Sequence, residues 1–341
     1  MKVLCFSSFT FSYLNRARVL YASLRRFHPD WELVALITDE PPPGFVLDIG
    51  AEPFDRVVYA ADLGIPNFRS WLFKHDIVEV CTAVKGPFLL QACSSGAEAV
   101  IYLDPDTALL GSLSPLEAWL ERDEVLLTPH LLEPNEEPLA IEDNDVATLR
   151  TGIYNLGFVA VRTHGEGARF AQWWNDRLLT HCYDDIPRGL FVDQRWCDHV
   201  PAMFDKVKVL RDPGYNVASW NLSRRKISVE KDGRILVNGV PLRFWHFTKL
   251  GPVGDAMTRR YAGDNFPVYE IWSWYKREVA AATEAAIAPR WWAYGAYQDG
   301  APIAKAHRLL YRGRPDLQAA FPDPYAAGPD SFQARMAEWT A

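Results

Sequence analysis

The sequence lacks the cysteine spacing of a metal site or a disulfide scaffold. Its five cysteines are scattered and form no CxxC pair, so a zinc-finger or disulfide-rich class is excluded. No apolar run reaches the roughly 18 residues that indicate a membrane-spanning helix. An apolar, strand-like run begins at residue 2 with no signal peptide before it. We therefore expect a cytoplasmic protein with reduced thiols and no transmembrane segment.

An excess of positive charge is missing as well. The chain has 43 acidic and 36 basic residues and a net charge of −7, which gives no electrostatic reason to expect a nucleic-acid partner. Apolar and aromatic residues are abundant instead, with 49% hydrophobic residues and 13 tryptophans among 341 residues. A chain of this length buries a large core, and the tryptophans indicate aromatic surfaces in that core or in a ligand cleft.

Strand-like apolar runs alternate with helical patterns through the first half of the chain. The predicted strands are residues 2–8, 32–38, 56–60 and 99–103. Ser12 is a candidate N-cap for the first helix. A further helical tract from about His75 is interrupted or ended at Gly86-Pro87. This alternation predicts an α/β fold with a mostly parallel sheet and helices on both faces.

The second half of the chain has a different character. Asp232-Gly233 and Asn238-Gly239 predict hairpins, the last strand of which ends in FWHF. The acidic stretch 132–148 is predicted to be a loop, and residues 269–288 a helix. The tail from Pro315 is expected to wrap the surface or fray. We predict one mixed α/β domain over residues 1–250, followed by a helical, aromatic-rich extension over 251–341.

Two carboxylates directly follow the buried strand 99–103. Asp104 and Asp106 flank Pro105, which stiffens the turn. Such carboxylates are costly at the end of a buried strand unless a cation neutralises them, and oxygen ligands suit Mg²⁺ or Mn²⁺. A second pair, Asp143 and Asp145, lies in a polar stretch without a strand. We interpret the first pair as candidate metal ligands, with an ordinary capped turn as the alternative.

Four features follow one another in a fixed order along the chain. They are the YLDPD pair, YNLGF from residue 154, FVDQRW from residue 191, and His246 at the end of the last hairpin strand. Together with NVASWNL from residue 216, this order resembles the nucleotide-sugar glycosyltransferases of the GT-A fold. It is most similar to the retaining family 8 and to related bacterial enzymes. The resemblance covers about residues 1–250 and implies a nucleotide-sugar-binding half (1–125) and a donor-sugar and acceptor half (126–250).

The resemblance implies a metal site and a diphosphate site. Asp104 and Asp106 match its metal-binding pair and His246 its third ligand, which favours Mn²⁺ (or Mg²⁺) as the cofactor. The alternative for His246 is a hydrogen-bonded core histidine. Lys85 lies near the position of a basic residue that contacts the diphosphate, and Lys249 is a second candidate. A solvated lysine on a helix is the alternative for Lys85.

The resemblance also assigns residues to the donor sugar. Asn155 and Gly157 match the segment that holds its hydroxyls, and strand packing is the alternative for Gly157. Asp193 would orient the sugar, and the amide oxygen of Gln194 would lie near the anomeric carbon. A helix N-cap is the alternative for Asp193. Because an amide is a poor nucleophile, direct front-face transfer with retention is favoured over a covalent intermediate.

The nucleoside end departs from the family pattern. Ser8, Thr10 and Tyr13 match the nucleotide-binding segment, but Thr10 and Ser12 replace the acidic and amide residues that family 8 has before its tyrosine. A UDP-sugar is therefore the default donor. Further along the chain, Arg195 replaces the acid that follows the Asp-Gln pair.

The resemblance thus implies a metal-dependent glycosyltransferase of the hexosyltransferase type. Its acceptor would be a glycan or lipid-linked precursor of a bacterial surface polysaccharide. One alternative is an inverting transferase whose base is Glu142, Asp143 or Asp145. Another is a catalytically silent protein that binds sugar nucleotides.

The aromatic, basic stretch near Arg290 suggests a further contact. Peripheral contact with the inner membrane is one role for it, and packing on the core or a dimer interface is the alternative. The residues concerned are Arg290, Trp291, Trp292, Arg308 and Arg312.

Overall fold

A seven-stranded sheet forms the centre of the protein, whose structure is a computed structural model that describes residues 1–340. The strand order is β10-β6-β7-β4-β1-β2-β3, and β7 runs antiparallel to both of its neighbours while the other pairs are parallel. The predicted α/β class with a mostly parallel sheet is therefore confirmed. The strands are β1 (Val3–Phe9), β2 (Glu32–Ile37), β3 (Arg56–Tyr59), β4 (Ala99–Leu103), β6 (Val125–Pro129), β7 (Tyr154–Arg162) and β10 (Val207–Val209).

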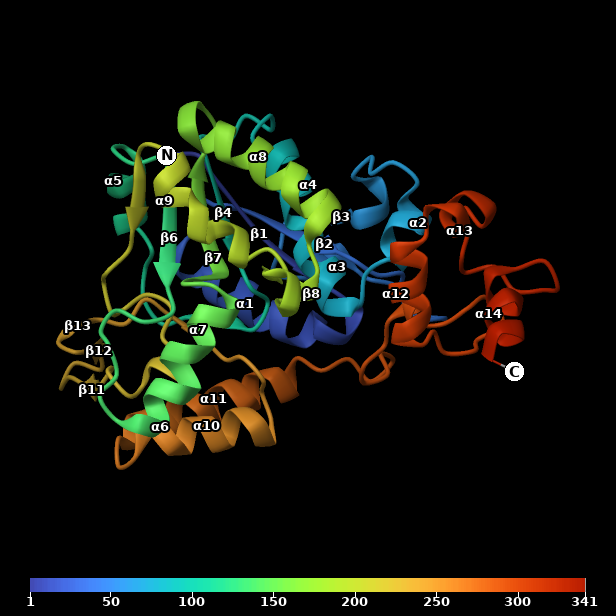
Figure 1. Cartoon of the computed structure of the whole chain (residues 1–341). Helices are drawn as coiled ribbons and strands as arrows, with labels where there is room; N and C mark the ends of the chain where they lie inside the picture. Colours follow the sequence, from blue (N-terminus) through green and yellow to red (C-terminus); the bar gives the residue numbers. More distant parts are fainter. Residues whose placement is uncertain (341) are drawn as a thin grey trace.

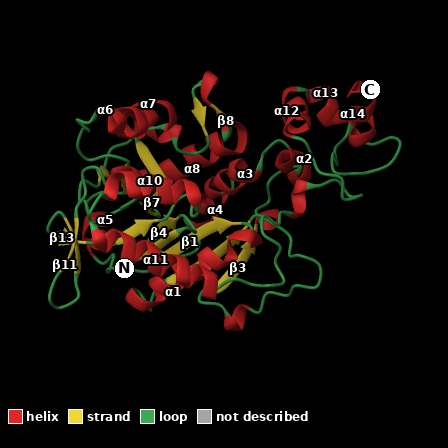
Figure 2. Cartoon of the chain, turned by 90° about the horizontal axis from the view of Figure 1, so that it is seen from below, coloured by secondary structure: helices red, strands yellow, loops and turns green. Residues whose placement is uncertain are grey.

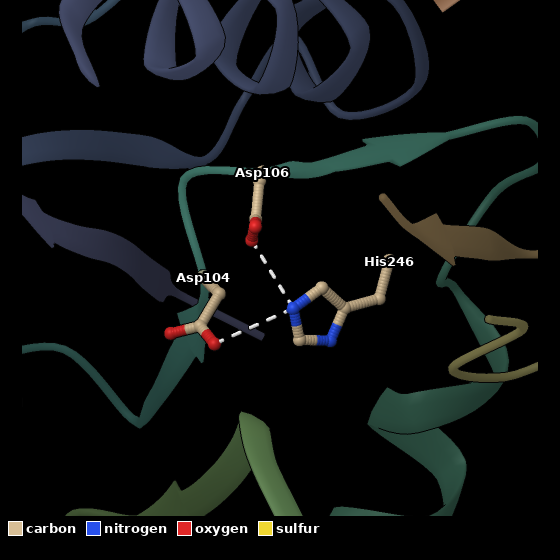
Figure 3. A group of neighbouring side chains, drawn as sticks. All are labelled: Asp104, Asp106 and His246. Atoms are coloured by element: carbon tan, nitrogen blue, oxygen red, sulfur yellow. Dashed lines mark ion pairs between the residues drawn. The ribbon is translucent and has the colours of Figure 1, made fainter. Parts of the chain in front are cut away.

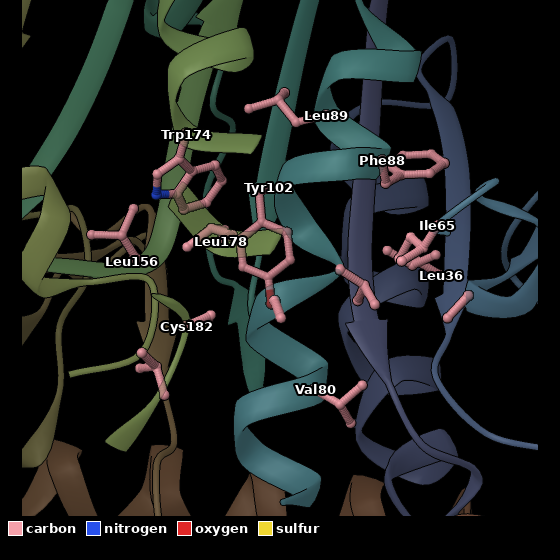
Figure 4. Close-up of a cluster of buried hydrophobic side chains, with 14 of the residues drawn as sticks. Leu36, Ile65, Val80, Phe88, Leu89, Tyr102, Leu156, Trp174, Leu178 and Cys182 are labelled. Atoms are coloured by element: carbon pink, nitrogen blue, oxygen red, sulfur yellow. The ribbon is translucent and has the colours of Figure 1, made fainter. Parts of the chain in front are cut away.

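Helices cover both faces of this sheet (Figure 1). On one face lie α3 (Ile77–Ala83), α4 (Lys85–Ala92) and α8 (Gly165–His181), and on the other α1 (Leu14–Phe27) and α5 (Pro115–Leu120). Alternate residues of β1 enter the two cores: Leu4 and Phe6 one, Val3 and Cys5 the other. In Figure 4, Trp174 and Leu178 of α8 lie close to Tyr102 of β4 in the first of these cores.

Two helix boundaries differ from the prediction. Ser12 lies in the 3₁₀ turn η1 (Phe11–Tyr13), and α1 begins at Leu14 with Tyr13 at the N-cap position. The hydroxyl of Ser12 instead shares a hydrogen bond with that of Thr10. The predicted break near Gly86 occurs at Val84, between α3 and α4. Gly86 lies within α4, and the close approach of α8 explains the glycine, because a Cβ there would be 2.8 Å from the Cα of Asn175.

The hairpin region forms a small separate sheet of β11 (Ile227–Val229), β12 (Ile235–Val237) and β13 (Val240–Pro241). The strand β14 (Phe244–His246) leaves this sheet and pairs antiparallel with β5 (Thr107–Leu109), the strand that directly follows the carboxylate pair. In this register His246 lies opposite Thr107. This pairing, rather than a hairpin, brings the histidine beside Asp106.

The acidic stretch 132–148 is largely helical, so its prediction as a loop was wrong. It forms α6 (Pro138–Ala140), a π-helical turn η4 (Ile141–Asp145) and α7 (Val146–Thr151). Few of its side chains are buried, and polar contacts hold it instead: Asp143 accepts hydrogen bonds from Arg260 and Tyr261. Hydrophobic periodicity therefore could not reveal these helices.

The extension after residue 250 packs partly onto the first of these cores and partly onto a third cluster, which includes Ala108 and Trp245. It begins with α10 (Pro252–Ala262) and α11 (Phe266–Ala281), and α11 corresponds to the helix predicted over 269–288 but ends at Ala281. In Figures 1 and 2, the later helices lie beside α2 (Phe68–Phe73), at the end of the molecule opposite β11–β13. These are α12 (Lys305–Gly313), α13 (Pro315–Ala320) and α14 (Phe332–Thr340). The tail from Pro315 is folded rather than frayed, because Leu317, Tyr325 and Phe332 are buried.

Arg308 and Arg312, two of the basic residues that suggested membrane contact, instead contact protein groups in this packing. The guanidinium of Arg308 is buried and donates to the carbonyl oxygens of Phe73, His75 and Tyr294. Arg312 pairs with Glu79. These contacts agree with the packing alternative for both arginines, whereas Arg290 is exposed.

The remaining short α-helix and strands are α9 (Val200–Met203), β8 (Asp184–Asp185) and β9 (Leu190–Phe191). Among residues 1–340, no helix combines the length and the apolar composition needed to cross a bilayer.

Candidate active site

Asp104, Asp106 and His246 come together at the end of β4. The Nε2 atom of His246 lies 3.1 Å from Oδ1 of Asp106 and 3.6 Å from Oδ2 of Asp104 (Figure 3). One ligand atom from each of the three residues lies within 4.8 Å of the other two. Two carboxylates and one imidazole at this spacing can hold a divalent cation such as Mn²⁺ or Mg²⁺.

Charge in this cluster is balanced within the protein. Burial disfavours a charged imidazole, but the carboxylates of Asp106 and Asp104 outweigh it and raise the pKa of His246. Burial likewise opposes the charge of Asp106, yet His246 lowers the pKa of that carboxyl. A proton on Nε2 would compete with a divalent cation for this position, so binding of the cation would release it.

Lys85, in the first turn of α4, joins the metal site to the expected sugar site. Its ammonium is buried and lies 2.8 Å from Oδ2 of Asp193 and 3.3 Å from Oδ1 of Asp104. It also donates to the carbonyl oxygen of Leu156 and lies 4.1 Å from the centre of the Tyr102 ring. The alternative of a solvated lysine is therefore wrong. Lys85 compensates two carboxylates that would otherwise be costly to bury.

Tyr102 is a site residue that the sequence analysis missed. Its hydroxyl donates to Oδ1 of Asp104 at 2.5 Å, which leaves Oδ2 facing His246. The sequence could have indicated this contact, because Tyr102 and Asp104 are two residues apart and such residues share a face of a strand. Ser8 lies behind this pair, with its hydroxyl 3.3 Å from that of Tyr102 and donating to the carbonyl oxygen of Cys81. Ser8 thus supports the site from within the core.

Gly157 gives the imidazole its space. A Cβ at this position would lie 2.6 Å from Cε1 and 2.7 Å from Nδ1 of His246, and 2.8 Å from Oδ1 of Asn155. No side chain fits there unless the histidine moves. Asn155 contacts His246 directly, since its Oδ1 lies 3.2 Å from Nδ1 of the ring.

Asp193 and Gln194 are both buried beside this cluster. Burial raises the pKa of Asp193, against the opposing effect of Lys85. Gln194, rather than Asp193, takes the N-cap position of the 3₁₀ turn η6 (Arg195–His199), and neither side chain caps it. The Nε2 atom of Gln194 donates to the carbonyl oxygen of Thr151 at 2.8 Å. Both side chains are therefore held in fixed positions.

Two of the expected nucleoside residues, Thr10 and Tyr13, lie between β1 and α1. Thr10 is buried and bonded to Ser12. Tyr13 is 37% exposed, and the guanidinium of Arg16, which the sequence analysis missed, lies 4.0 Å from its ring centre. Lys249, the second candidate for the diphosphate, is exposed in the turn after β14 and forms no ion pair within residues 1–340.

Asp39, at the end of β2, connects the sheet to the extension. Its carboxylate accepts hydrogen bonds from the backbone N–H groups of Phe11, Glu40 and Ala293. Burial raises the pKa of this carboxyl to about 7 despite these donors.

Comparisons with known proteins find no matching family model. The chain is 29% identical over 241 residues to the uncharacterized protein YfnF of Bacillus subtilis (strain 168), covering 69% of this chain and 77% of YfnF. Its structure is similar to that of the galactosyltransferase LgtC solved with donor and acceptor sugar analogues. The two chains are 15% identical in sequence, and their superposition covers 83% of this chain and 97% of LgtC with a TM-score of 0.44. Mouse xyloside xylosyltransferase 1 is similar at 14% identity over 74% of this chain and 98% of its own, with a TM-score of 0.41. Both solved structures are those of glycosyltransferases.

Proposed function

We propose that this protein is a metal-dependent glycosyltransferase that uses a nucleoside-diphosphate sugar, by default a UDP-sugar. The observation that carries the proposal is the Asp104, Asp106 and His246 cluster with Lys85, Asp193 and Gln194 directly beside it. A divalent cation held there, Mn²⁺ or Mg²⁺, would neutralise charge on the departing diphosphate. Lys85 places a second positive charge on the same side of the site.

Transfer breaks the bond between the anomeric carbon and the diphosphate oxygen, and forms a bond from that carbon to an acceptor hydroxyl oxygen. In the proposed reaction, the acceptor proton passes to the departing diphosphate oxygen on the same face. Gln194 would present its amide oxygen to the positive charge that develops on the sugar ring. Because a neutral amide does not readily form a stable glycosyl bond, we propose retention by front-face transfer.

The inverting alternative requires a free carboxylate base. Two of its candidates have structural partners: Asp143 accepts from Arg260 and Tyr261, and Asp145 accepts from Asn135. Tyr261 and Arg260 lower the pKa of Asp143, which weakens it as a base at neutral pH. These contacts favour the retaining mechanism.

A panel of UDP-, GDP-, dTDP- and ADP-sugars, tested by thermal shift with and without Mn²⁺, identifies the donor. Slow hydrolysis of the stabilising sugar nucleotide should then appear in the wild type without an acceptor and vanish in Asp106→Asn. Asp330→Asn, an exposed carboxylate outside the site, is the matched control. Binding without hydrolysis would support the silent binding protein instead, and no shift with any sugar nucleotide would refute both functions.

The acceptor in this proposal is a glycan or a lipid-linked precursor of a surface polysaccharide, as the resemblance implies. We propose a cytoplasmic location with peripheral contact at the inner membrane, to which the exposed Arg290 could contribute. Co-sedimentation with anionic vesicles tests the contact, and an Arg290→Gln protein that sediments like the wild type would contradict it.

A further inference from the structure

The side-chain amide of Asn155 lies between the metal site and Gln194. Its Oδ1 faces three groups: Nδ1 of His246 at 3.2 Å, Nδ2 of Asn216 at 3.1 Å and the backbone N–H of Gly157 at 3.3 Å. Its Nδ2 faces Oε1 of Gln194 at 3.4 Å and Nε2 of His130 at 3.3 Å. One buried amide thus contacts both a candidate metal ligand and the candidate catalytic amide.

The direction of each hydrogen bond follows from groups that can act in only one way. The backbone N–H of Gly157 can only donate, so the Asn155 atom that faces it is the oxygen. An amide oxygen can only accept, so Nδ1 of His246 carries a hydrogen. Nε2 is then the ring nitrogen that can bind a cation, and it is the one facing Asp104 and Asp106.

The same reasoning fixes the orientation of Gln194. Its Nε2 donates to the carbonyl oxygen of Thr151, which can only accept. Its Oε1 is therefore the atom that receives the N–H of Asn155. On the other side, Nδ1 of His130 donates to the carbonyl oxygen of Ile153, which leaves Nε2 of His130 as an acceptor for Asn155. Each contact of the Asn155 side chain thus joins a hydrogen-bond donor to an acceptor.

Asn155 has little capacity left for a ligand. Its two N–H hydrogens match two acceptors, and its oxygen already receives three donors. The resemblance implied that Asn155 holds sugar hydroxyls, but within residues 1–340 its amide is occupied by protein groups. The NVASWNL segment explains part of this arrangement, because it supplies the fully buried Asn216.

We propose that Asn155 is a positioning residue that holds His246 in the tautomer able to bind a cation through Nε2 and fixes the amide oxygen of Gln194. The role of Gln194 here rests on the proposed function, whereas the effect on His246 concerns cation binding alone. Removing the partner of a metal-binding histidine commonly weakens metal affinity by 10- to 100-fold.

Two substitutions separate the two halves of this role. Asn155→Ala removes both contacts, so Mn²⁺ affinity should fall about 10- to 100-fold. Asn155→Asp keeps an oxygen that accepts from Nδ1 of His246 but offers no N–H to Gln194. Its Mn²⁺ affinity should equal or exceed that of the wild type, while hydrolysis of the sugar nucleotide falls at saturating Mn²⁺. Asn144→Ala, a buried asparagine without a side-chain partner in the described chain, is the control.

Mn²⁺ affinity is measured by electron paramagnetic resonance of the free ion, without any sugar nucleotide. Recovery of affinity in Asn155→Asp but not in Asn155→Ala supports the proposal, and a merely structural role would not produce that difference. Wild-type affinity in Asn155→Ala, or equal losses in both variants, would overturn it. If Asn155→Ala does not fold, lost affinity in a folded Asn155→Asp protein still overturns it. A wild type that binds Mn²⁺ but hydrolyses no sugar nucleotide would refute the proposed function while leaving the His246 contact intact.

Discussion

Gly157→Ala tests whether the imidazole of His246 must lie where the structure places it. The added methyl group would be 2.6 Å from Cε1 of the ring, about 0.8 Å closer than the 3.4 Å at which ordinary contacts begin. The neighbouring Oδ1 of Asn155, at 2.8 Å, prevents the methyl group from moving to the other side. The ring of His246 must therefore shift from its position beside Asp104 and Asp106, or the strand β7 must shift.

Either response should weaken the cation site. Overpacking of this kind costs about 1–3 kcal/mol of stability. Displacement of one of three protein ligands should reduce Mn²⁺ affinity at least as much as loss of a supporting contact, by about 10- to 100-fold, or about 1.4–2.7 kcal/mol. The measurement is a Mn²⁺ titration followed by electron paramagnetic resonance, with thermal unfolding as a check on folding.

Gly313→Ala is the matched control, because a Cβ there meets no atom within 4 Å. It should leave Mn²⁺ affinity unchanged. A Gly157→Ala protein that is folded and binds Mn²⁺ like the wild type would refute the reasoning, since His246 would then not be a ligand held in this position.

Three further predictions concern charge and stability. Lys85→Met leaves the carboxylates of Asp104 and Asp193 without their buried cation, so the free energy of unfolding in urea should fall by about 3 kcal/mol; a loss below about 1 kcal/mol would contradict the ion-pair network. The pKa of Asp39 is about 7 in the folded protein, above its value in the unfolded chain. The free energy of unfolding should therefore fall as pH rises from about 4 to 7, by up to about 1.4 kcal/mol per pH unit. Asp39→Asn should remove that slope. If the free energy of unfolding depends on pH in the same way in both proteins, Asp39 is not the source of the slope. Arg308→Met leaves three buried carbonyl oxygens without their donor and should cost about 3 kcal/mol in the same assay, whereas the exposed Arg335→Met should have little effect.

The sheet and the carboxylate pair could be predicted because their signals are local. Apolar runs of four to eight residues identified β1, β2, β3 and β4, and the position of Asp104 and Asp106 directly after a buried strand marked the site. Tyr102 could have been added from the alternation of strand side chains. These features depend only on neighbouring residues.

The approach of His246 to the carboxylates could not be derived from local pattern. It depends on the pairing of β14 with β5, two strands far apart in the sequence. The resemblance supplied that association, and the register of the two strands explains it. The Asn155 network was missed for a similar reason, because its groups come from β7, β14, the ends of β6 and η6, and the NVASWNL segment. Which polar side chains meet in a buried network depends on packing, which periodicity does not report.

The helices of residues 138–151 and of the tail were missed for a different reason. Helices α6 and α7 bury few side chains and are held by contacts such as Asp143 with Arg260. The tail is rich in proline, glycine and alanine, yet a few large residues such as Tyr325 and Phe332 anchor it in the core. Composition alone therefore underestimates how well ordered a segment is when a small number of buried aromatic side chains fix it.

The most direct test of the central claim is a crystal structure of the protein soaked with Mn²⁺, with anomalous scattering measured at the manganese edge. The account predicts one strong anomalous peak shared by Oδ2 of Asp104, Oδ1 of Asp106 and Nε2 of His246. A peak elsewhere in the molecule, or none under conditions in which the protein binds its sugar nucleotide, would contradict it.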